Sequence, residues 1–184
     1  MQKFIRKSFE LVYESKIVAL YKDTLETPDG RLVEYDYIKH KSGGGAGVLL
    51  VDDKECTYLI KQYRNSIDDI SLEIPAGGYS VTGENGEICA IREAEEETGY
   101  IPTRMYHVAN VISSVGTFDE KTDIYIGTNL VVGNQKLDPD EFVEVVYLPI
   151  DEALQKVYNG TIIDSKTILA LFAYKEYKRE GIIE

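Results

Sequence analysis

Residues 84 to 97, with the sequence ENGEICAIREAEEE, are the part of the chain best suited to chemistry, because they include six glutamates. If the segment is helical, Glu93, Glu96 and Glu97 share one face, where their like charges repel one another. A hard divalent cation would remove that repulsion. Oxygen ligands in this arrangement suit Mg²⁺ or Mn²⁺, which couple one or two protein carboxylates to substrate phosphates. The alternative interpretation is a solvated acidic helix face.

A helix over residues 86–98 is predicted to carry these glutamates. Its apolar residues recur near helical spacing, and Gly99 is a good stop signal. They are Ile88, Ala90, Ile91 and Ala94. Ahead of the helix, the segment SLEIPAGGY at 71–79 contains a proline and two glycines near its end. This pattern predicts that a strand closes there and a loop opens.

The chain before residue 70 has the pattern of two sheets. A small antiparallel unit is predicted from three short extended runs with turn chemistry at Pro28 to Gly30. The three glycines at 43–45 are interpreted as a flexible break. Two apolar strands that follow are expected in a second sheet, closer to the core. The runs lie at 9–13, 15–23, 31–39, 46–53 and 57–64.

After the acidic helix the strand pattern returns and two further helices follow. Strands are predicted at 105–115, 123–132 and 141–150. Asp151 is expected to cap a helix over the next residues, and Asp164 or Ser165 a final helix. Strands therefore surround a few helices without the regular alternation of a doubly wound parallel sheet.

Size and charge restrict the class of protein. A chain of 184 residues is long enough for one core and short for two domains. Its net charge of -12 argues against binding to nucleic acid or to an anionic membrane, and no stretch is apolar enough to span a bilayer. Cys56 and Cys89 have neither disulfide-framework nor zinc-site spacing, so we expect a cytoplasmic protein.

The acidic helix is part of a longer motif, G-x5-E-x7-R-E-U-x-E-E-x-G-U, in which U is aliphatic. All its fixed positions are present, at Gly78, Glu84, Arg92, Glu93, Glu96, Glu97 and Gly99. Residues 78–100 therefore resemble the Nudix box of the Nudix hydrolases. The U positions depart from the pattern, with Ala94 and Tyr100, and PAGG places the box glycine one residue later than usual.

Five further segments resemble the ADP-ribose pyrophosphatase branch of that family. They are LIKQYRNS, LEIPAG, SSVGTFDEKTDIYIG, DEFVEVVYLPIDEAL and IDSKT. The resemblance implies an α/β fold (α+β, with a mixed sheet): a Nudix α/β/α sandwich over residues 43–184, with an N-terminal antiparallel β extension over 1–42. It also implies a homodimer, in which the extensions are exchanged.

The implied metal site contains Mg²⁺, with Mn²⁺ as a possible substitute. Glu93 and Glu97 are the principal expected ligands, and Glu96 is an additional one. A backbone carbonyl is expected to join them, from Ala76 or, as the alternative, from Gly77. The implied role of Arg92 is to orient the carboxylates through charge-assisted hydrogen bonds. Glu84 is expected to cap or brace the join between loop and helix, or else to bind metal directly.

The resemblance assigns the remaining site residues. Arg64 is expected near the substrate diphosphate; its alternative is an arginine at a strand end paired with a surface acid. Glu120 is expected on a mobile loop as general base or as an additional metal ligand; its alternative is a solvated loop residue. Gly116, in a Ser-Val-Gly that replaces the usual Ser-Pro-Gly, is expected to contact substrate.

Other polar and aromatic residues receive structural interpretations. His40 and His107 have no carboxylate or serine partner at a recognisable spacing, and Cys89 is expected in the core. Tyr13, Tyr21 or Tyr35 could stack on an adenine, but ordinary packing within the sheet is favoured.

The expected function is hydrolysis of a nucleoside diphosphate-sugar, a small-molecule substrate. ADP-ribose, split into AMP and ribose 5-phosphate, is favoured. The alternatives are a GDP- or UDP-sugar, or a non-catalytic ADP-ribose sensor. A calcium-binding module is disfavoured, because the chain lacks the motif D-x-[DN]-x-[DN]-G.

Overall fold

The computed structural model describes residues 1–80, 83–139 and 141–183. The strands are β1 (Ile5–Glu14), β2 (Val18–Glu26), β3 (Leu32–His40), β4 (Gly44–Val51), β5 (Cys56–Arg64), β6 (Asp69–Glu73), β7 (Ala76–Gly78), β8 (Tyr100–Ile112), β9 (Lys121–Val132) and β10 (Val143–Pro149). The helices are α1 (Gly86–Thr98), α2 (Ile150–Tyr158) and α3 (Ser165–Arg179). None of the described helices is long and apolar enough to span a membrane.

The chain separates into two compact units. One contains Met1–Gly44 together with the loop segment Ile112–Lys121, and the other contains Gly45–Val111 and Thr122–Glu184. In the first unit, β1, β2 and β3 form a three-stranded antiparallel sheet, which confirms the predicted N-terminal antiparallel unit. Tyr21 stacks on Tyr37 in this sheet, with ring centroids 5.4 Å apart, so this tyrosine has the packing role that the sequence favours.

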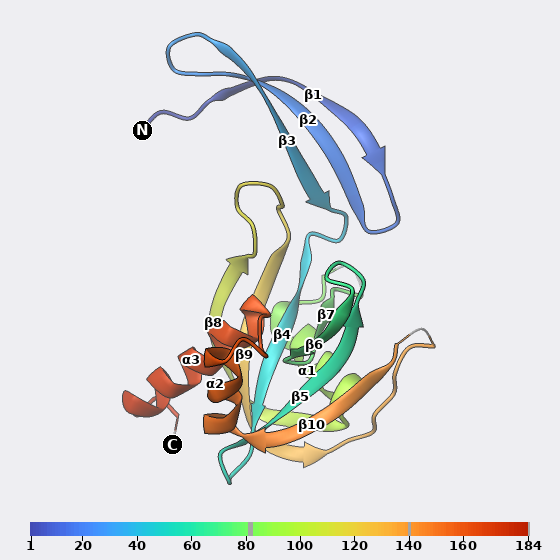
Figure 1. Cartoon of the computed structure of the whole chain (residues 1–184), viewed down its shortest axis with the longest axis vertical. Coiled ribbons are helices and arrows are strands. Elements are labelled where there is room, and N and C mark those ends of the chain that lie inside the picture. Colours follow the sequence, from blue (N-terminus) through green and yellow to red (C-terminus); the bar gives the residue numbers. More distant parts are fainter. Residues whose placement is uncertain (81–82, 140, 184) are drawn as a thin grey trace. The chain divides into compact units, whose positions relative to one another are not determined.

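The second unit is a sheet with helices on both faces. Five strands lie in the order β10-β5-β4-β9-β8, and β6 and β7 pair with β5 and β4. Because side chains alternate along a strand, Val48 and Leu50 pack with α1, whereas Leu49 and Val51 pack with α2 and α3. Figure 1 shows α1 and the pair α2 and α3 on opposite sides of the sheet. The predicted α/β sandwich is confirmed.

Most element predictions hold, with one corrected cap. The helix at 86–98 is confirmed, and Gly99 ends it in the left-handed conformation, with φ 75°. Asp164 caps α3 by accepting a hydrogen bond from the Thr167 amide. The prediction that Asp151 caps the next helix is wrong, because α2 begins one residue earlier, at Ile150. Ile150 is buried, and its amide donates to the Glu55 carbonyl, which fixes the start of the helix.

The predicted break at the glycines 43–45 coincides with the boundary between the two units, but two of these glycines belong to a strand rather than to a flexible segment. Gly44 and Gly45 are the first residues of β4 and are buried. A Cβ at Gly44 would lie 1.8 Å from the Lys121 carbonyl oxygen, and one at Gly45 would lie 2.0 Å from that of Gly77. These positions require glycine because other backbone passes through the space of a side chain.

Candidate active site

Helix α1 positions the acidic residues. Asn85 caps its first turn by accepting from the Ile88 amide, and the apolar face packs on β4 through Cys89, Ala90 and Ala94, all fully buried. The prediction that Cys89 is a core residue is confirmed. This packing turns Glu93 and Glu97 inward, toward the segment around β7, and leaves them only 7% and 2% exposed.

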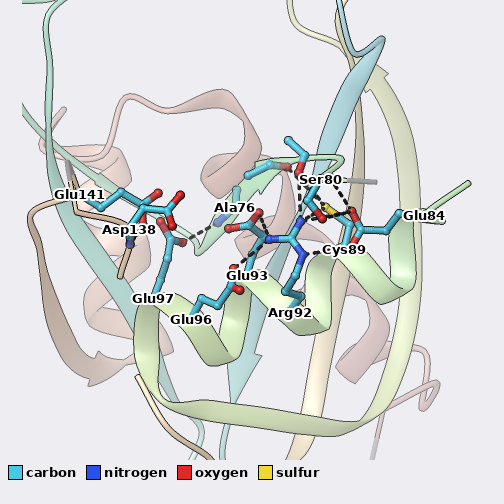
Figure 2. A network of polar contacts seen from close by, with 12 residues as sticks. Ala76, Ser80, Glu84, Cys89, Arg92, Glu93, Glu96, Glu97, Asp138 and Glu141 are labelled. Carbon is cyan, nitrogen blue, oxygen red and sulfur yellow. Dashed lines mark hydrogen bonds and ion pairs between the residues drawn. The ribbon is translucent and has the colours of Figure 1, made fainter. Parts of the chain in front are cut away.

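Arg92 is the centre of a polar network on this helix (Figure 2). Its Nε donates to Glu84 Oε1 at 3.0 Å, and its Nη1 donates to Glu93 Oε1 at 2.6 Å and Glu96 Oε2 at 2.8 Å. Its Nη2 donates to the Gly78 carbonyl at 3.0 Å. One guanidinium thus links three carboxylates to the loop before the helix. This is the geometry that the predicted orienting role of Arg92 requires.

Glu84 braces the loop before α1. Its Oε2 accepts from the Ser80 amide at 2.8 Å, while Oε1 accepts from Arg92. Both oxygens therefore contact the protein in a way that fits the bracing role. The contacts favour this role over direct metal binding.

Glu97 is a buried carboxylate without a cationic partner in hydrogen-bond contact among the described residues. Its Oε2 accepts from the Ala76 amide at 2.9 Å. Burial raises the pKa of Glu97 to about 8; the Ala76 hydrogen bond lowers it, and the charges of Glu93 and Glu141 raise it further. Burial also raises the pKa of Glu93, although Arg92 opposes the shift. Two adjacent buried carboxyls that disfavour ionisation form a site that a cation would stabilise.

The donor set fits a hard divalent cation. Glu93, Glu96 and Glu97 offer only oxygen ligands, on one side of one helix. Within the described residues, no three acidic, histidine or cysteine side chains converge in metal-binding geometry. The reason lies in the network itself, since the Arg92 guanidinium bonds both Glu93 and Glu96. The three carboxylates are therefore neighbours on the helix without being arranged around one point.

The backbone beside these carboxylates is closely packed. A Cβ at Gly77 would lie 2.2 Å from Glu93 Oε1, so a larger residue here would displace the Glu93 carboxylate. The Gly77 carbonyl faces the Cys89 thiol, with 3.6 Å between oxygen and sulfur. Of the two expected carbonyl donors, this contact favours Ala76.

Two acidic residues that the sequence analysis did not single out lie beside the site. Figure 2 shows Asp138 and Glu141 next to Glu97. Glu141 Oε2 accepts from the Asp138 amide at 3.1 Å, and the Glu141 charge raises the pKa of both Glu93 and Glu97. Glu141 belongs to the segment DEFVEVV. Its distance along the chain from the Nudix box does not indicate that it lies beside Glu97.

Arg64 forms a bidentate ion pair with a buried acid. Its Nε and Nη2 donate to Glu73 Oε1 and Oε2 at 2.8 and 2.7 Å. Lys166 also contacts Glu73 Oε2, at 3.3 Å. Burial raises the pKa of Glu73, but the hydrogen bonds from Arg64 and the charge of Lys166 outweigh it and lower the pKa to about 2. The acid considered for Arg64 in the sequence analysis was a surface residue; Glu73 is only 3% exposed.

The loop that carries Gly116 and Glu120 belongs to the first unit, where backbone hydrogen bonds tie it to β3. The Ile38 amide donates to the Thr117 carbonyl at 2.7 Å, and the Asp119 amide donates to the Ile38 carbonyl at 3.1 Å. The His40 amide donates to Asp119 Oδ1 at 2.7 Å. The loop is therefore anchored to β3, although the resemblance implies a mobile one.

Both histidines lie near a carboxylate in the fold, although neither acid stands at a sequence spacing that would indicate a pair. His40 Nε2 lies 3.7 Å from Glu120 Oε1, and His40 Nδ1 lies 3.0 Å from Ser42 Oγ. His107 Nε2 lies 3.4 Å from Asp123 Oδ1. These histidines are 80 and 16 positions from their acids, separations at which a sequence pattern carries no signal.

Gly116 lines a cavity of about 540 Å³ within the first unit. Tyr35 and Tyr37 of β3 also line it, as do Arg6 and Asp23. Among the three tyrosines considered for base stacking, Tyr35 is the one on this cavity.

Comparison with known proteins identifies the family. The NUDIX domain matches residues 41–171. An ADP-ribose pyrophosphatase from Bacillus subtilis (strain 168) is 34% identical over 88% of this chain and 87% of its own length. A methanol dehydrogenase activator from Bacillus methanolicus is 33% identical, with the same coverage. A crystal structure of an ADP compounds hydrolase has the same fold, with a TM-score of 0.83, 21% identity and coverage of 100% of this chain and 98% of that one. The chain belongs to the Nudix family, as the motif at 78–100 predicts.

Proposed function

We propose that this protein is a Mg²⁺-dependent hydrolase that cleaves the diphosphate of a nucleoside diphosphate-sugar, with ADP-ribose as the preferred substrate. The observation that carries the proposal is the pair of buried carboxylates, Glu93 and Glu97, at the face of a helix held by Arg92. The similarity to an ADP-ribose pyrophosphatase supports the substrate. The products are AMP and ribose 5-phosphate.

In this proposal the chain's own residues bind the ion and the diphosphate. Glu93, Glu97, Glu96 and the Ala76 carbonyl hold the metal, and Arg92 orients the carboxylates. A bound Mg²⁺, or Mn²⁺ in its place, supplies Lewis acidity and lowers the pKa of water. Arg64 binds the diphosphate through N–H groups that Glu73 does not use.

Glu120 is proposed as the general base, on the resemblance to the ADP-ribose pyrophosphatases. It takes a proton from the attacking water, whose oxygen forms a bond to one phosphorus while the bridging P–O bond breaks. The bridging electrons leave with the other phosphate. Gly116 is proposed as a substrate contact, which its place on the cavity beside Tyr35 supports.

We also propose that the protein is a cytoplasmic homodimer. The free thiols of Cys56 and Cys89 suit a reducing compartment. The N-terminal sheet exposes several large apolar side chains, which suits a surface covered by a second copy. They include Phe9, Leu11, Tyr13 and Leu32, each between 47% and 65% exposed. Sedimentation equilibrium of the purified chain tests the dimer, and a monomer at micromolar concentration would contradict it.

The function is tested by hydrolysis with Mg²⁺ across a substrate panel. Wild type and Glu97→Gln are assayed with ADP-ribose, GDP-mannose, UDP-glucose and NADH. We expect ADP-ribose to be the best substrate and the variant to lose at least about a hundredfold in kcat. Glu87→Gln is the matched control, because Glu87 is an exposed glutamate in the first turn of the same helix.

Each other outcome has a distinct meaning. A higher kcat/KM for GDP-mannose or UDP-glucose would keep the site chemistry and overturn the preferred substrate. Binding of ADP-ribose without turnover of any compound would favour the sensor. Equal activity in wild type and Glu97→Gln would exclude Glu97 from the metal site.

A further inference from the structure

We propose that Lys166 is a positioning residue, which sets the orientation of Arg64 toward a diphosphate through the buried carboxylate of Glu73. The inference rests on the proposed function, because it assigns Arg64 to the substrate. Lys166 lies at the start of α3, about a hundred residues along the chain from Arg64. Lys166 lies outside the Nudix box.

Four side chains form a line of alternating charge. Arg64 bonds both oxygens of Glu73, and Lys166 Nζ lies 3.3 Å from Glu73 Oε2. On its other side Lys166 Nζ donates to Asp164 Oδ1 at 2.6 Å. The order is therefore positive, negative, positive, negative. Glu73, in the middle, is the most deeply buried, with 4% of its side chain exposed.

This line is fixed to the backbone that leads to the metal site. Asp164 Oδ2 accepts from the amide and the hydroxyl of Thr167, at 2.9 and 2.7 Å. The fully buried hydroxyl of Thr167 accepts in turn from the Ile74 amide at 2.8 Å. Helix α3 is thus tied to the residue next to Glu73. Lys166 and Glu73 meet with little freedom to move apart.

The arrangement leaves part of Arg64 available. A guanidinium has five N–H donors, and the pair with Glu73 uses those of Nε and Nη2. Within the described parts of the chain, Nη1 has no hydrogen-bond partner. The Arg64 side chain is 38% exposed, so these donors remain accessible while the other edge is held. A guanidinium whose Nε side is held by a carboxylate keeps its plane fixed. Its remaining N–H groups can then donate to a phosphate.

Lys166 acts on the Arg64 guanidinium in two ways. Its bond to Oε2 fixes the plane of the Glu73 carboxylate, and a bidentate pair transmits that plane to the guanidinium. Its charge also balances Asp164. Without the Lys166 charge, the remaining three residues have a net charge of −1, and this negative charge repels an approaching diphosphate. Loss of Lys166 should therefore weaken diphosphate binding through Arg64, without touching the metal ligands.

The test is a double-mutant cycle between Lys166→Met and Arg64→Met. Binding of the non-cleavable α,β-methylene analogue of ADP-ribose is measured calorimetrically with Mg²⁺. We expect Lys166→Met to raise Kd about tenfold in the wild-type background. In the Arg64→Met background it should change Kd by less than about twofold, because the residue through which it acts is gone. An equal effect in both backgrounds, or none in wild type, would overturn the proposal.

Two controls separate positioning from stability. Lys175→Met removes a lysine from the same helix that pairs with exposed Asp151, and it should leave Kd unchanged. Lys166→Arg keeps the charge and should restore most of the affinity lost in Lys166→Met. If Lys166→Met does not fold, Lys166→Gln replaces it in the cycle, since it also removes the charge that contacts Glu73.

The readout is independent of turnover. If wild type binds the analogue but hydrolyses no nucleotide, the proposed enzymatic function fails and the cycle is still decisive. If wild type does not bind the analogue, the same cycle is measured with inorganic pyrophosphate and Mg²⁺. Failure of wild type to bind pyrophosphate as well would overturn both proposals.

Discussion

His40 Nε2 lies 3.7 Å from Glu120 Oε1, and the same ring contacts Ser42 Oγ through Nδ1 at 3.0 Å. The His40 amide also donates to Asp119, the neighbour of Glu120. His40 therefore lies beside the Glu120 carboxylate through its ring and binds the side chain of the preceding residue through its amide. Because a base must be placed within reach of the proton that it takes, such support matters when Glu120 acts as proposed.

We predict that His40→Ala lowers kcat for ADP-ribose hydrolysis about tenfold, by loosening Glu120, with little change in KM. Steady-state kinetics with Mg²⁺ measures both constants. His107→Ala is the matched control, because His107 pairs with Asp123 in the other unit. A loss of the same size in both variants would show that the effect is not specific to Glu120.

We predict that Gly45→Ala lowers the free energy of unfolding by about 3 kcal/mol. The added Cβ would lie 2.0 Å from the Gly77 carbonyl oxygen, so β4 and β7 would have to separate. Urea denaturation measures the change. Gly116→Ala is the control, since a Cβ there meets no atom within 4 Å. Equal stability of both variants would contradict the close packing of β4 against β7 at Gly45.

Sequence patterns correctly predicted the helices and strands that depend only on residues close together in the chain. The helix at 86–98 follows from apolar spacing and from a glycine stop, and both are properties of neighbouring residues. The cap of α2 was misplaced because the burial of Ile150, a tertiary effect, outweighed the capping preference of Asp151. Glycines 44 and 45 were misread for the same reason, since the atoms that exclude a side chain come from distant segments.

The candidate site likewise contains residues that sequence spacing reveals and residues that only the fold brings together. Glu93, Glu96 and Glu97 lie on one helix, so their spacing revealed them. The partners Glu73, Lys166 and Glu141 come from separate segments, and only the fold brings them close. Their segments were recognised by resemblance, but no spacing rule connects a lysine at 166 with an acid at 73.

We predict that Glu73 makes stability depend on pH at acid pH. The folded pKa of about 2 lies below the ordinary value of 4.5, so the ionised form stabilises the fold above pH 4.5. That stabilisation, about 3 kcal/mol, is lost as the pH falls from 4.5 through 2. Urea denaturation of wild type and Glu73→Gln at pH 7, 4 and 2.5 should show a difference that shrinks with acid. A difference independent of pH would contradict the prediction.

We predict that Mg²⁺ raises the thermal stability of the protein through the carboxylates of α1. An ion that binds only the folded state at a hundred times its Kd adds about 2.7 kcal/mol, or roughly 5 to 10 °C in Tm for a chain of this size. Glu97→Gln should lose most of that gain, because it removes a buried ligand. Glu87→Gln, which changes an exposed glutamate, should keep it. Scanning calorimetry of wild type and the two variants, with and without EDTA, measures the three shifts in Tm. An equal gain in both variants would place the cation elsewhere.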